Sequence, residues 1–346
     1  MGAALTIQEL DDSWLDCIQP GYDELGQPNF MTPTGDLVTG IFVDIPNEVY
    51  HSLPALSSSG LKKFRVSPAH YYREYMSDIE RKRTTVQQRT LDAGTYGHEL
   101  VLEPDGFYDR YYRGIVESQM EKGVLFTADD LKKELIELGA PHSGKKDELA
   151  KRLLKLAPEK KIFTVMQEEL AKANPDKQLI DGVVWDDAHR IMDSVYKSVD
   201  APVLLEDGFS ELTVIATCPM TGLILKCRFD RLRRDAVASD VKTTMDASPE
   251  GFRRQIEKLG YHLQEAFYTH VARAAGIPIE HFWFIAVEYQ QADICEVYEI
   301  GPKGKQKSMF QFLQHLNEFK AVSEDEDWYG YSKDRTAKTI ELSRWA

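Results

Sequence analysis

Two short segments decide the fold of this chain, Cys227-Arg228-Phe229-Asp230 and Ser239-Asp240-Val241-Lys242-Thr243. Each follows a short apolar run, and together they predict the two strands of a β-hairpin, Leu223–Arg231 and Ala236–Thr243. The polar stretch Arg233-Arg234-Asp235 is the expected turn between them.

The register of this hairpin decides what its charged residues can do. If the strands pair symmetrically about Asp235, Asp230 lies directly opposite Asp240, with Cβ atoms about 4.5–5.5 Å apart. Lys242 lies two residues beyond Asp240, so it projects from the same face of the strand. Two carboxylates and an ammonium group would then converge, which suits a hard divalent cation and a phosphate.

Mg²⁺ fits such a site because it prefers oxygen ligands, usually one or two carboxylates together with water and substrate phosphate. We predict Asp230, Asp240 and the backbone carbonyl of Val241 as ligands. Lys242 would orient a water molecule or neutralise charge that develops on the phosphorus centre. A surface Asp–Lys pair of little energetic value is the alternative, and spacing alone leaves both interpretations open.

Composition bounds the possibilities. The chain has 346 residues, of which 42% are hydrophobic and 28% charged, as expected for two globular domains or one with an insertion. The formal net charge of −14 disfavours a generally sticky nucleic-acid binder. The hairpin is nevertheless locally basic, through Lys226, Arg228, Arg231, Arg233 and Arg234.

Several features lead us to expect a cytoplasmic protein. No apolar run approaches the roughly 18 residues that span a bilayer. The N-terminus lacks the basic start and apolar stretch of a signal peptide. The four cysteines are widely scattered without a CxxC pair, so we expect free thiols and neither a zinc site nor an iron–sulfur cluster.

Periodicity predicts an α/β fold, with a mixed central sheet flanked by helices. We expect four parts: an N-terminal arm at 1–45, a core segment at 46–122, an inserted module at 123–158, and the catalytic part with a C-terminal tail at 159–346. Helices are expected from Ser57, at Thr90–Leu102, at Tyr261–Ala275 and at Lys305–Val322.

The sequence of the inserted module predicts two amphipathic helices joined by a five-residue turn. Leucines recur on one face of each helix, and Gly139 ends the first. Lys145, Lys146, Lys151 and Arg152 lie in and before the second helix.

A distributed set of motifs resembles a known family. The sequence Asp230 … Asp240-Val241-Lys242, followed by Gln264-Glu265-Ala266-Phe267-Tyr268, is similar to the PD-(D/E)XK nuclease pattern with the helix of its RecB-like branch. Leu56-Ser57-Ser58-Ser59-Gly60-Leu61 and Gly94-Thr95-Tyr96-Gly97-His98 resemble further motifs of that branch. The segments Glu48-Val49-Tyr50-His51 and Asp240-Val241-Lys242-Thr243-Thr244 are most similar to RecE-type phage and prophage exonucleases.

The resemblance implies roles for individual residues. His98, Asp230 and Asp240 would be metal ligands and Lys242 the catalytic lysine, with Glu211 as a further acidic position. Gln264 and Tyr268 would position the lysine or the DNA backbone. Taken alone, His98 would be interpreted as a buried helix histidine, and the Gly-x-x-x-His context reverses that interpretation. Separately from the resemblance, the local cluster of basic residues leads us to expect that Arg228, Arg231 and Arg233 contact DNA, with a solvated hairpin of alternating charge as the alternative.

The inserted segment 126–157 resembles a SAP module, a helix–turn–helix unit that usually binds DNA. Its basic residues Lys145, Lys146, Lys151 and Arg152 would contact phosphates. Because acidic residues nearly balance the basic ones, the affinity should be weak and sensitive to salt. A helical hairpin used for protein contacts is the alternative.

The expected function is therefore a Mg²⁺-dependent deoxyribonuclease, with Mn²⁺ as a substitute ion, that degrades double-stranded DNA from its ends. The resemblance implies 5′ to 3′ digestion that leaves a 3′ single strand for an annealing protein, a ring-shaped homo-oligomer, and phage or prophage origin in a bacterial host. Two alternatives remain: a DNA-binding recruiter that acts through the SAP-like module, and a structure-specific endonuclease or single-strand exonuclease on the same fold.

Overall fold

The computed structural model describes residues 12–79 and 85–342, and the chain forms two compact units. The first unit combines Met1–Arg83 with Asp193–Ala346, and the second is the intervening segment Thr84–Met192. The main sheet and most of the predicted site belong to the first unit. None of the described helices is both long and apolar enough to cross a membrane.

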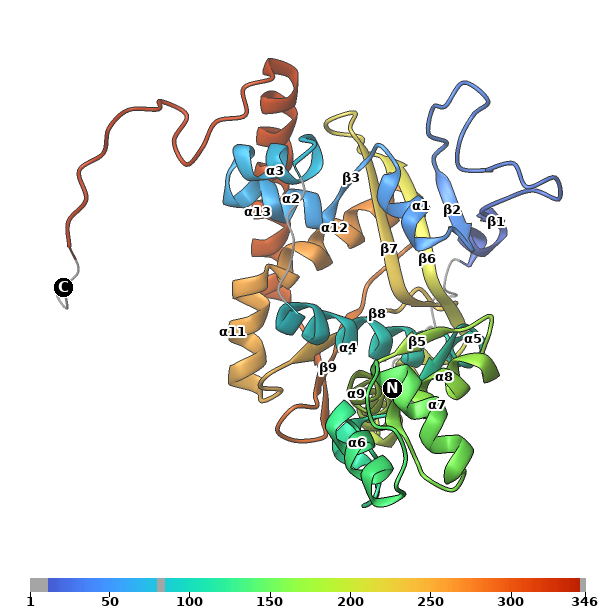
Figure 1. Ribbon diagram of the computed structural model, residues 1–346. Coiled ribbons are helices and arrows are strands. Elements are labelled where there is room, and N and C mark those ends of the chain that lie inside the picture. The colour runs from blue at the N-terminus through green and yellow to red at the C-terminus, as the bar shows by residue number, and fades with distance from the viewer. Residues whose placement is uncertain (1–11, 80–84, 343–346) are drawn as a thin grey trace. The chain divides into compact units, whose positions relative to one another are not determined.

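A mixed sheet forms the centre of the first unit (Figure 1). Its strands β1 and β2 are parallel, as are β8 and β9, and the short strand β3 (Leu56–Ser57) runs parallel to β7, while the remaining neighbours are antiparallel. This confirms the predicted mixed α/β architecture. In spatial order the strands are β1 (Ile18–Pro20), β2 (Gly40–Val43), β6 (Gly208–Thr217), β7 (Ile224–Arg233), β8 (Ala238–Thr244), β9 (Phe282–Glu288) and β10 (Ile294–Glu299).

Helices pack against this sheet through one large apolar core. Phe267 of α12 (Tyr261–Ala274) and Phe312 of α13 (Pro302–Asp325) are fully buried there, together with Cys227 and Phe229 of β7. In Figure 1 these helices gather beside the strands with α2 and α3. The remaining helices of this unit are α1 (Asn47–Ser52), α2 (Ser58–Val66), α3 (Pro68–Tyr75), α10 (Ala201–Leu205) and α11 (Pro249–Leu259).

A serine and a glycine mark helix boundaries where the sequence predicted them. The Ser57 side chain accepts a hydrogen bond from the Gly60 N–H and so caps α2. Gly260 lies between α11 and α12 and has a φ of 68°. Residues other than glycine rarely adopt this left-handed conformation without strain.

The segment predicted as an N-terminal arm contributes to the sheet. Strand β2 pairs with β6, with Ile41 opposite Val214. Ile41 and Phe42 are both buried, and they enter two different apolar clusters because successive strand residues face opposite sides. This two-sided burial holds the segment in place despite its many turn residues.

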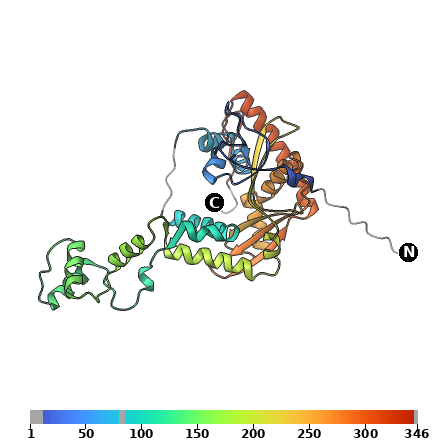
Figure 2. The same ribbon diagram turned by 90° about the vertical axis from the view of Figure 1, so that its right-hand side faces the viewer.

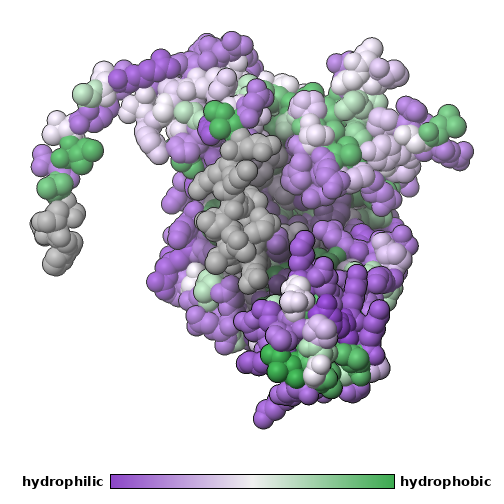
Figure 3. Space-filling model, in the orientation of Figure 1, coloured by the Kyte–Doolittle hydropathy of each residue, from purple (hydrophilic) through white to green (hydrophobic). Residues whose placement is uncertain are grey.

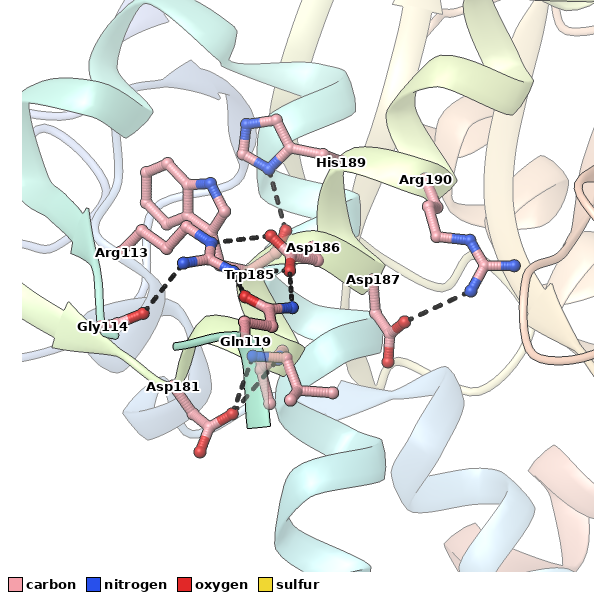
Figure 4. Close-up of polar contacts among 11 residues, drawn as sticks. Arg113, Gly114, Gln119, Asp181, Trp185, Asp186, Asp187, His189 and Arg190 are labelled. Atoms are coloured by element: carbon pink, nitrogen blue, oxygen red, sulfur yellow. Dashed lines mark hydrogen bonds and ion pairs between the residues drawn. The ribbon is translucent and has the colours of Figure 1, made fainter. Parts of the chain in front are cut away.

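The second unit contains a helical frame and the inserted module. A short parallel pair joins β4 (Tyr111–Arg113) to β5 (Gln178–Ile180). Arg113 ties β4 to α9 through two 2.7 Å hydrogen bonds to the Asp186 carboxylate, which Gln119 also contacts (Figure 4). The helices of the frame are α4 (Thr85–Leu102), α5 (Pro104–Arg110), α8 (Phe163–Ala173) and α9 (Gly182–Lys197).

The module has a small core of its own. Its helices α6 (Ala128–Glu137) and α7 (Lys146–Leu156) bury Leu131, Leu135, Leu149 and Leu153, and Figure 2 shows this green part of the chain as a compact group. Gly139 has the left-handed φ expected for the residue that ends α6.

The module also exposes apolar side chains. Ile136, Leu138 and Leu156 are each about half exposed, and hydrophobic surface is visible low in the view of Figure 3. Most of the surface in that view is hydrophilic.

One buried carboxylate predicts a pH dependence of stability. Glu265 of α12 is 3% exposed, and its nearest cation, the Lys305 ammonium, lies 3.5 Å away. Burial raises the pKa of Glu265 to about 7, and Lys305 offsets this only in part. Because the pKa of this acid is raised in the folded state, stability should be lost as the pH rises from about 4.5 to 7.

Glu265→Gln should remove this loss. Between pH 5 and pH 8 the free energy of unfolding of the wild type should fall by about 2–3 kcal/mol relative to that of the variant. Urea denaturation of both proteins at the two pH values measures the difference. Parallel pH dependence in the two proteins would show that Glu265 ionises normally.

Candidate metal and phosphodiester site

The sheet forks on one side of β7, and the candidate site lies at the fork. Strand β3 (Leu56–Ser57) pairs with β7 at Leu225 and Lys226, whereas β8 pairs with it at Arg231 and Leu232. Between these two contacts the β7–β8 ladder stops. There the Asp230 carboxylate accepts a hydrogen bond from the Val241 N–H, with Oδ2 and N 2.8 Å apart.

The hairpin has the register predicted from the sequence. Arg231 pairs with Ser239 and Leu232 with Ala238, which is symmetric about Asp235. The printed pairing ends there, and Asp230 and Asp240 are the first residues beyond it, where the Asp230 side chain accepts the Val241 N–H. A shift of a single residue would have turned one of the two carboxylates to the other face of the sheet.

Glu211 extends this row onto a third strand. Ser210 pairs with Arg231 and Leu212 with Phe229, so Glu211 of β6 lies opposite Asp230. A carboxylate oxygen of Glu211 lies within 4.8 Å of one of Asp230. Acidic residues of the predicted site thus lie on three neighbouring strands, with Glu211 and Asp230 close together on β6 and β7 and Asp240 on β8. We call these three residues the acidic row.

The backbone is distorted where this row crosses the strands. Glu211 has a φ of 52°, a left-handed conformation that costs a non-glycine residue about 1–2 kcal/mol. Phe229 and Leu232 are three residues apart, yet both enter the main core, whereas a regular strand would place them on opposite faces. The alternation of β7 thus shifts by one residue beside Glu211. Strain retained at such a point is typical of a functional position.

Asp240 is held by two partners. It is only 1% exposed, and its Oδ1 accepts a 2.7 Å hydrogen bond from the Gln264 amide. Its Oδ2 forms an ion pair with the Lys242 ammonium. Of the predicted site residues, Asp240, Lys242 and Gln264 therefore lie together in the first unit.

Lys242 stays charged in this setting. Burial alone would lower the pKa of its ammonium, but the carboxylates of Asp240 and Asp230 outweigh burial and raise the pKa above its ordinary value. The side chain also lies over the ring of Tyr261, with Nζ 5.2 Å from the centroid. A lysine of this kind supplies positive charge and is a poor proton acceptor.

The two tyrosines of α12 lie close to these groups. Tyr268 packs edge-to-face on Phe229, with ring centroids 5.1 Å apart. Burial, followed by the charges around it, including those of Asp240 and Asp230, raises the pKa of its phenol. Tyr261 stacks on Phe284 and contacts Lys242, so it is both a core residue and part of the site's wall.

Sequence reasoning missed Lys62. This residue of α2 lies beside Gln264, with Nζ 3.4 Å from the amide Oε1. It also lies over Tyr261, 5.7 Å from the ring centroid. The motif at Leu56–Leu61 located the helix, but only the β3–β7 pairing shows that the helix begins at the fork.

Two of the arginines predicted to contact DNA are bonded to groups of the protein itself, and one of them, Arg228, is buried. Arg228 is 7% exposed and donates hydrogen bonds to the Ile45 carbonyl and the Thr213 hydroxyl. It also lies 3.7 Å from the Glu211 carboxylate. Arg233 is paired with Asp235 in the turn. Arg228 therefore has an internal role, because its side chain is buried and its guanidinium group is hydrogen-bonded within the protein.

The remaining predicted DNA contacts differ in exposure. Arg231 is partly buried and donates to the Ser210 hydroxyl. In the module, Lys146 donates to the Phe126 carbonyl, and Arg152 donates to the carbonyls of the α6–α7 turn. Lys145 and Lys151 are exposed.

The donor set fits a hard divalent cation. Carboxylate oxygens gathered at one point, one of them on a residue with a left-handed backbone, are the ligands that Mg²⁺ and Mn²⁺ favour. The N–H and C=O of one strand residue point to the same side, so the Val241 carbonyl faces the Asp230 side of β8. His98 lies on α4 of the second unit, and its part in the site remains a prediction.

The strain at Glu211 can be measured by substitution. Glu211→Gly and Glu211→Gln both remove the carboxylate, but only glycine relieves the left-handed backbone. We expect the glycine variant to have a free energy of unfolding about 0.5–1 kcal/mol above that of the glutamine variant. Chemical denaturation of both variants measures this difference, and a less stable glycine variant would contradict the assigned strain.

Comparison with known proteins places the chain in a family. No match is found among curated proteins. Two solved structures are weakly similar to the chain. The first, from Eubacterium rectale and provisionally named an exonuclease, has 13% identity and a TM-score of 0.49 over 87% of this chain and 97% of its own. The second, SSO0001, has 12% identity and a TM-score of 0.23 over 64% and 86%.

Neither of these likenesses is strong enough to add to the assignment. A family profile, by contrast, matches residues 57–336, which include α2, the acidic row and the Gln264 helix. That family is described as a PDDEXK-like domain of unknown function, DUF3799, and the chain belongs to it.

Proposed function

We propose that the protein is a metal-dependent deoxyribonuclease. The observation that carries this proposal is the close approach of the Glu211 and Asp230 carboxylates on β6 and β7, together with Asp240 of the next strand, which is paired with Lys242. Membership of a PDDEXK-like family supports the same reaction class, the hydrolysis of a phosphodiester bond.

Each residue has a distinct part in this reaction. A divalent cation held by the carboxylates would polarise the phosphodiester and lower the pKa of a bound water. Gln264 fixes Asp240 in the orientation that the ligand role requires. Lys242, charged and partly buried, stabilises the negative charge that builds up as the phosphorus–oxygen bond breaks. His98 and the Val241 carbonyl would complete the ligand set.

The proposed substrate is the end of double-stranded DNA, digested 5′ to 3′. The RecE-like motifs support this choice, and with it a single-strand annealing partner and an oligomeric enzyme. The module would add weak, salt-sensitive DNA affinity through Lys145 and Lys151, the exposed members of its predicted contact set.

Cleavage of end-labelled linear duplex with Mg²⁺ tests the catalytic assignment. Asp240→Asn should lower the rate more than about a hundredfold, because it removes a ligand charge and the partner of Lys242. Asp325→Asn, an exposed change at the end of α13, should leave the rate unchanged. Circular dichroism checks that both variants are folded. Full activity of a folded Asp240→Asn variant would rule out the site.

The form of the DNA tests the mode of action. An end-dependent exonuclease should degrade linear duplex and leave a closed circular duplex intact over the same time. Cleavage of the circle would favour a structure-specific endonuclease, and selective loss of single strands would favour a single-strand exonuclease. Binding without cleavage under every divalent cation would favour the recruiter role of the module.

A further inference from the structure

Lys62 brings a second ammonium group to the site. It follows the Ser57 cap by five residues on α2, which begins where β3 leaves the fork. Its Nζ lies 5.7 Å from the Tyr261 ring centroid, and the Nζ of Lys242 lies 5.2 Å from the same centroid. The two lysines therefore flank one aromatic side chain from different elements of the fold.

The two ammonium groups differ in how their charge is balanced. Lys242 is paired with Asp240. Among the described residues, Lys62 forms no ion pair with a carboxylate; its polar contact is the uncharged Gln264 amide, at 3.4 Å. Asp240, the carboxylate that would be its natural partner, is already bound by Lys242 and Gln264.

Burying the Lys62 ammonium without an ion pair lowers the stability of the folded protein when no anion is bound. Burial, together with the charge of Lys242, lowers the pKa of Lys62 to about 8, and Asp240 offsets the shift only in part. A partly buried cation without a counter-charge destabilises a folded protein unless a ligand supplies one. The lysine side chain is a compact point charge that suits a phosphate oxygen.

We propose that Lys62 binds a non-bridging oxygen of a DNA phosphate beside the scissile bond. The inference rests on the proposed nuclease function and adds to it a substrate-binding residue from α2. In this arrangement Lys242 serves the reacting phosphate next to Asp240, and Lys62 holds the adjoining phosphate and so fixes the position of the strand.

A role through Gln264 is the competing explanation. Lys62 could merely orient the amide that holds Asp240. The contact of 3.4 Å is long for a hydrogen bond, which makes it a weak device for orientation. A phosphate contact and an orientation role also differ in what they do to DNA affinity, so experiment separates them.

The test compares Lys62→Met with Lys63→Met. Both remove one lysine charge from α2, but the Lys63 ammonium is paired with Glu74 of α3 at 2.5 Å. Binding of short duplexes is measured with Ca²⁺ in place of Mg²⁺, across a series of salt concentrations. Lys62→Met should weaken binding roughly tenfold and lower the salt slope by about one, whereas Lys63→Met should do neither.

Neutral linkages locate the contact. Duplexes that carry a single methylphosphonate, one linkage at a time, are bound by wild type and by Lys62→Met. At one linkage near the site, the methylphosphonate should weaken the binding of the wild type and leave the binding of Lys62→Met unchanged. If Lys62→Met binds like Lys63→Met, or responds to every linkage as the wild type does, the proposal is wrong.

Two further readouts keep the outcomes distinct. The melting temperature of Lys62→Met should not fall, because the substitution removes an unbalanced charge; a lower value would indicate a structural role and would count against the proposal. The binding assay needs no cleavage. Absence of cleavage by the wild type with Mg²⁺ or Mn²⁺ would therefore overturn the nuclease function while the linkage data still report on Lys62.

Discussion

The hydrogen bond from the Val241 N–H to the Asp230 carboxylate holds the site open. In a continuous ladder a backbone carbonyl of β7 would take this donor, and the two strands would stay paired. Here a side chain takes it, at 2.8 Å, and the strands separate without leaving a buried N–H unsatisfied. The gap on this side of β7 admits β3 at the other end of the strand. That pairing starts α2 and brings Lys62 to the site.

Two buried cations of β7 lie near the acidic residues of the site. Lys226 and Arg228 share the face of β7 opposite the main core, and both are nearly fully buried. Lys226 donates to the carbonyls of Tyr50, His51 and Leu53, where α1 ends. Arg228 donates to the Ile45 carbonyl and lies near Glu211. These cations join the segment before α2 to β7 and offset the acidic row beside it.

The sequence predicted the parts of this arrangement that depend on local pattern. Alternation and turn chemistry fixed the register of the β7–β8 hairpin, and serine and glycine signals located the starts of α2 and α12. Motif spacing brought Asp240, Lys242 and Gln264 to one site, although Gln264 was expected to position the lysine or the DNA backbone and donates a hydrogen bond to Asp240. These features require only neighbouring residues or one strand pairing.

Other features depend on contacts far apart in the chain and could not be predicted. The positive φ of Glu211 arises from the pairing of β6 with a distorted β7, which no local signal reveals. Lys62 reaches Gln264 across 202 residues of sequence. Arg228 was predicted to contact DNA from its charge alone. Its hydrogen-bond partners are Thr213 of β6 and the carbonyl of Ile45, which follows β2, and both are distant in sequence.

The central claim is that the row of Glu211, Asp230 and Asp240 holds a divalent cation. Anomalous diffraction from crystals grown with Mn²⁺ tests it most directly. The account predicts one strong anomalous peak within coordination distance, about 2.0–2.3 Å, of oxygens from Asp230 and Asp240. A saturated crystal with no peak there, or with Mn²⁺ bound only elsewhere on the chain, would contradict it.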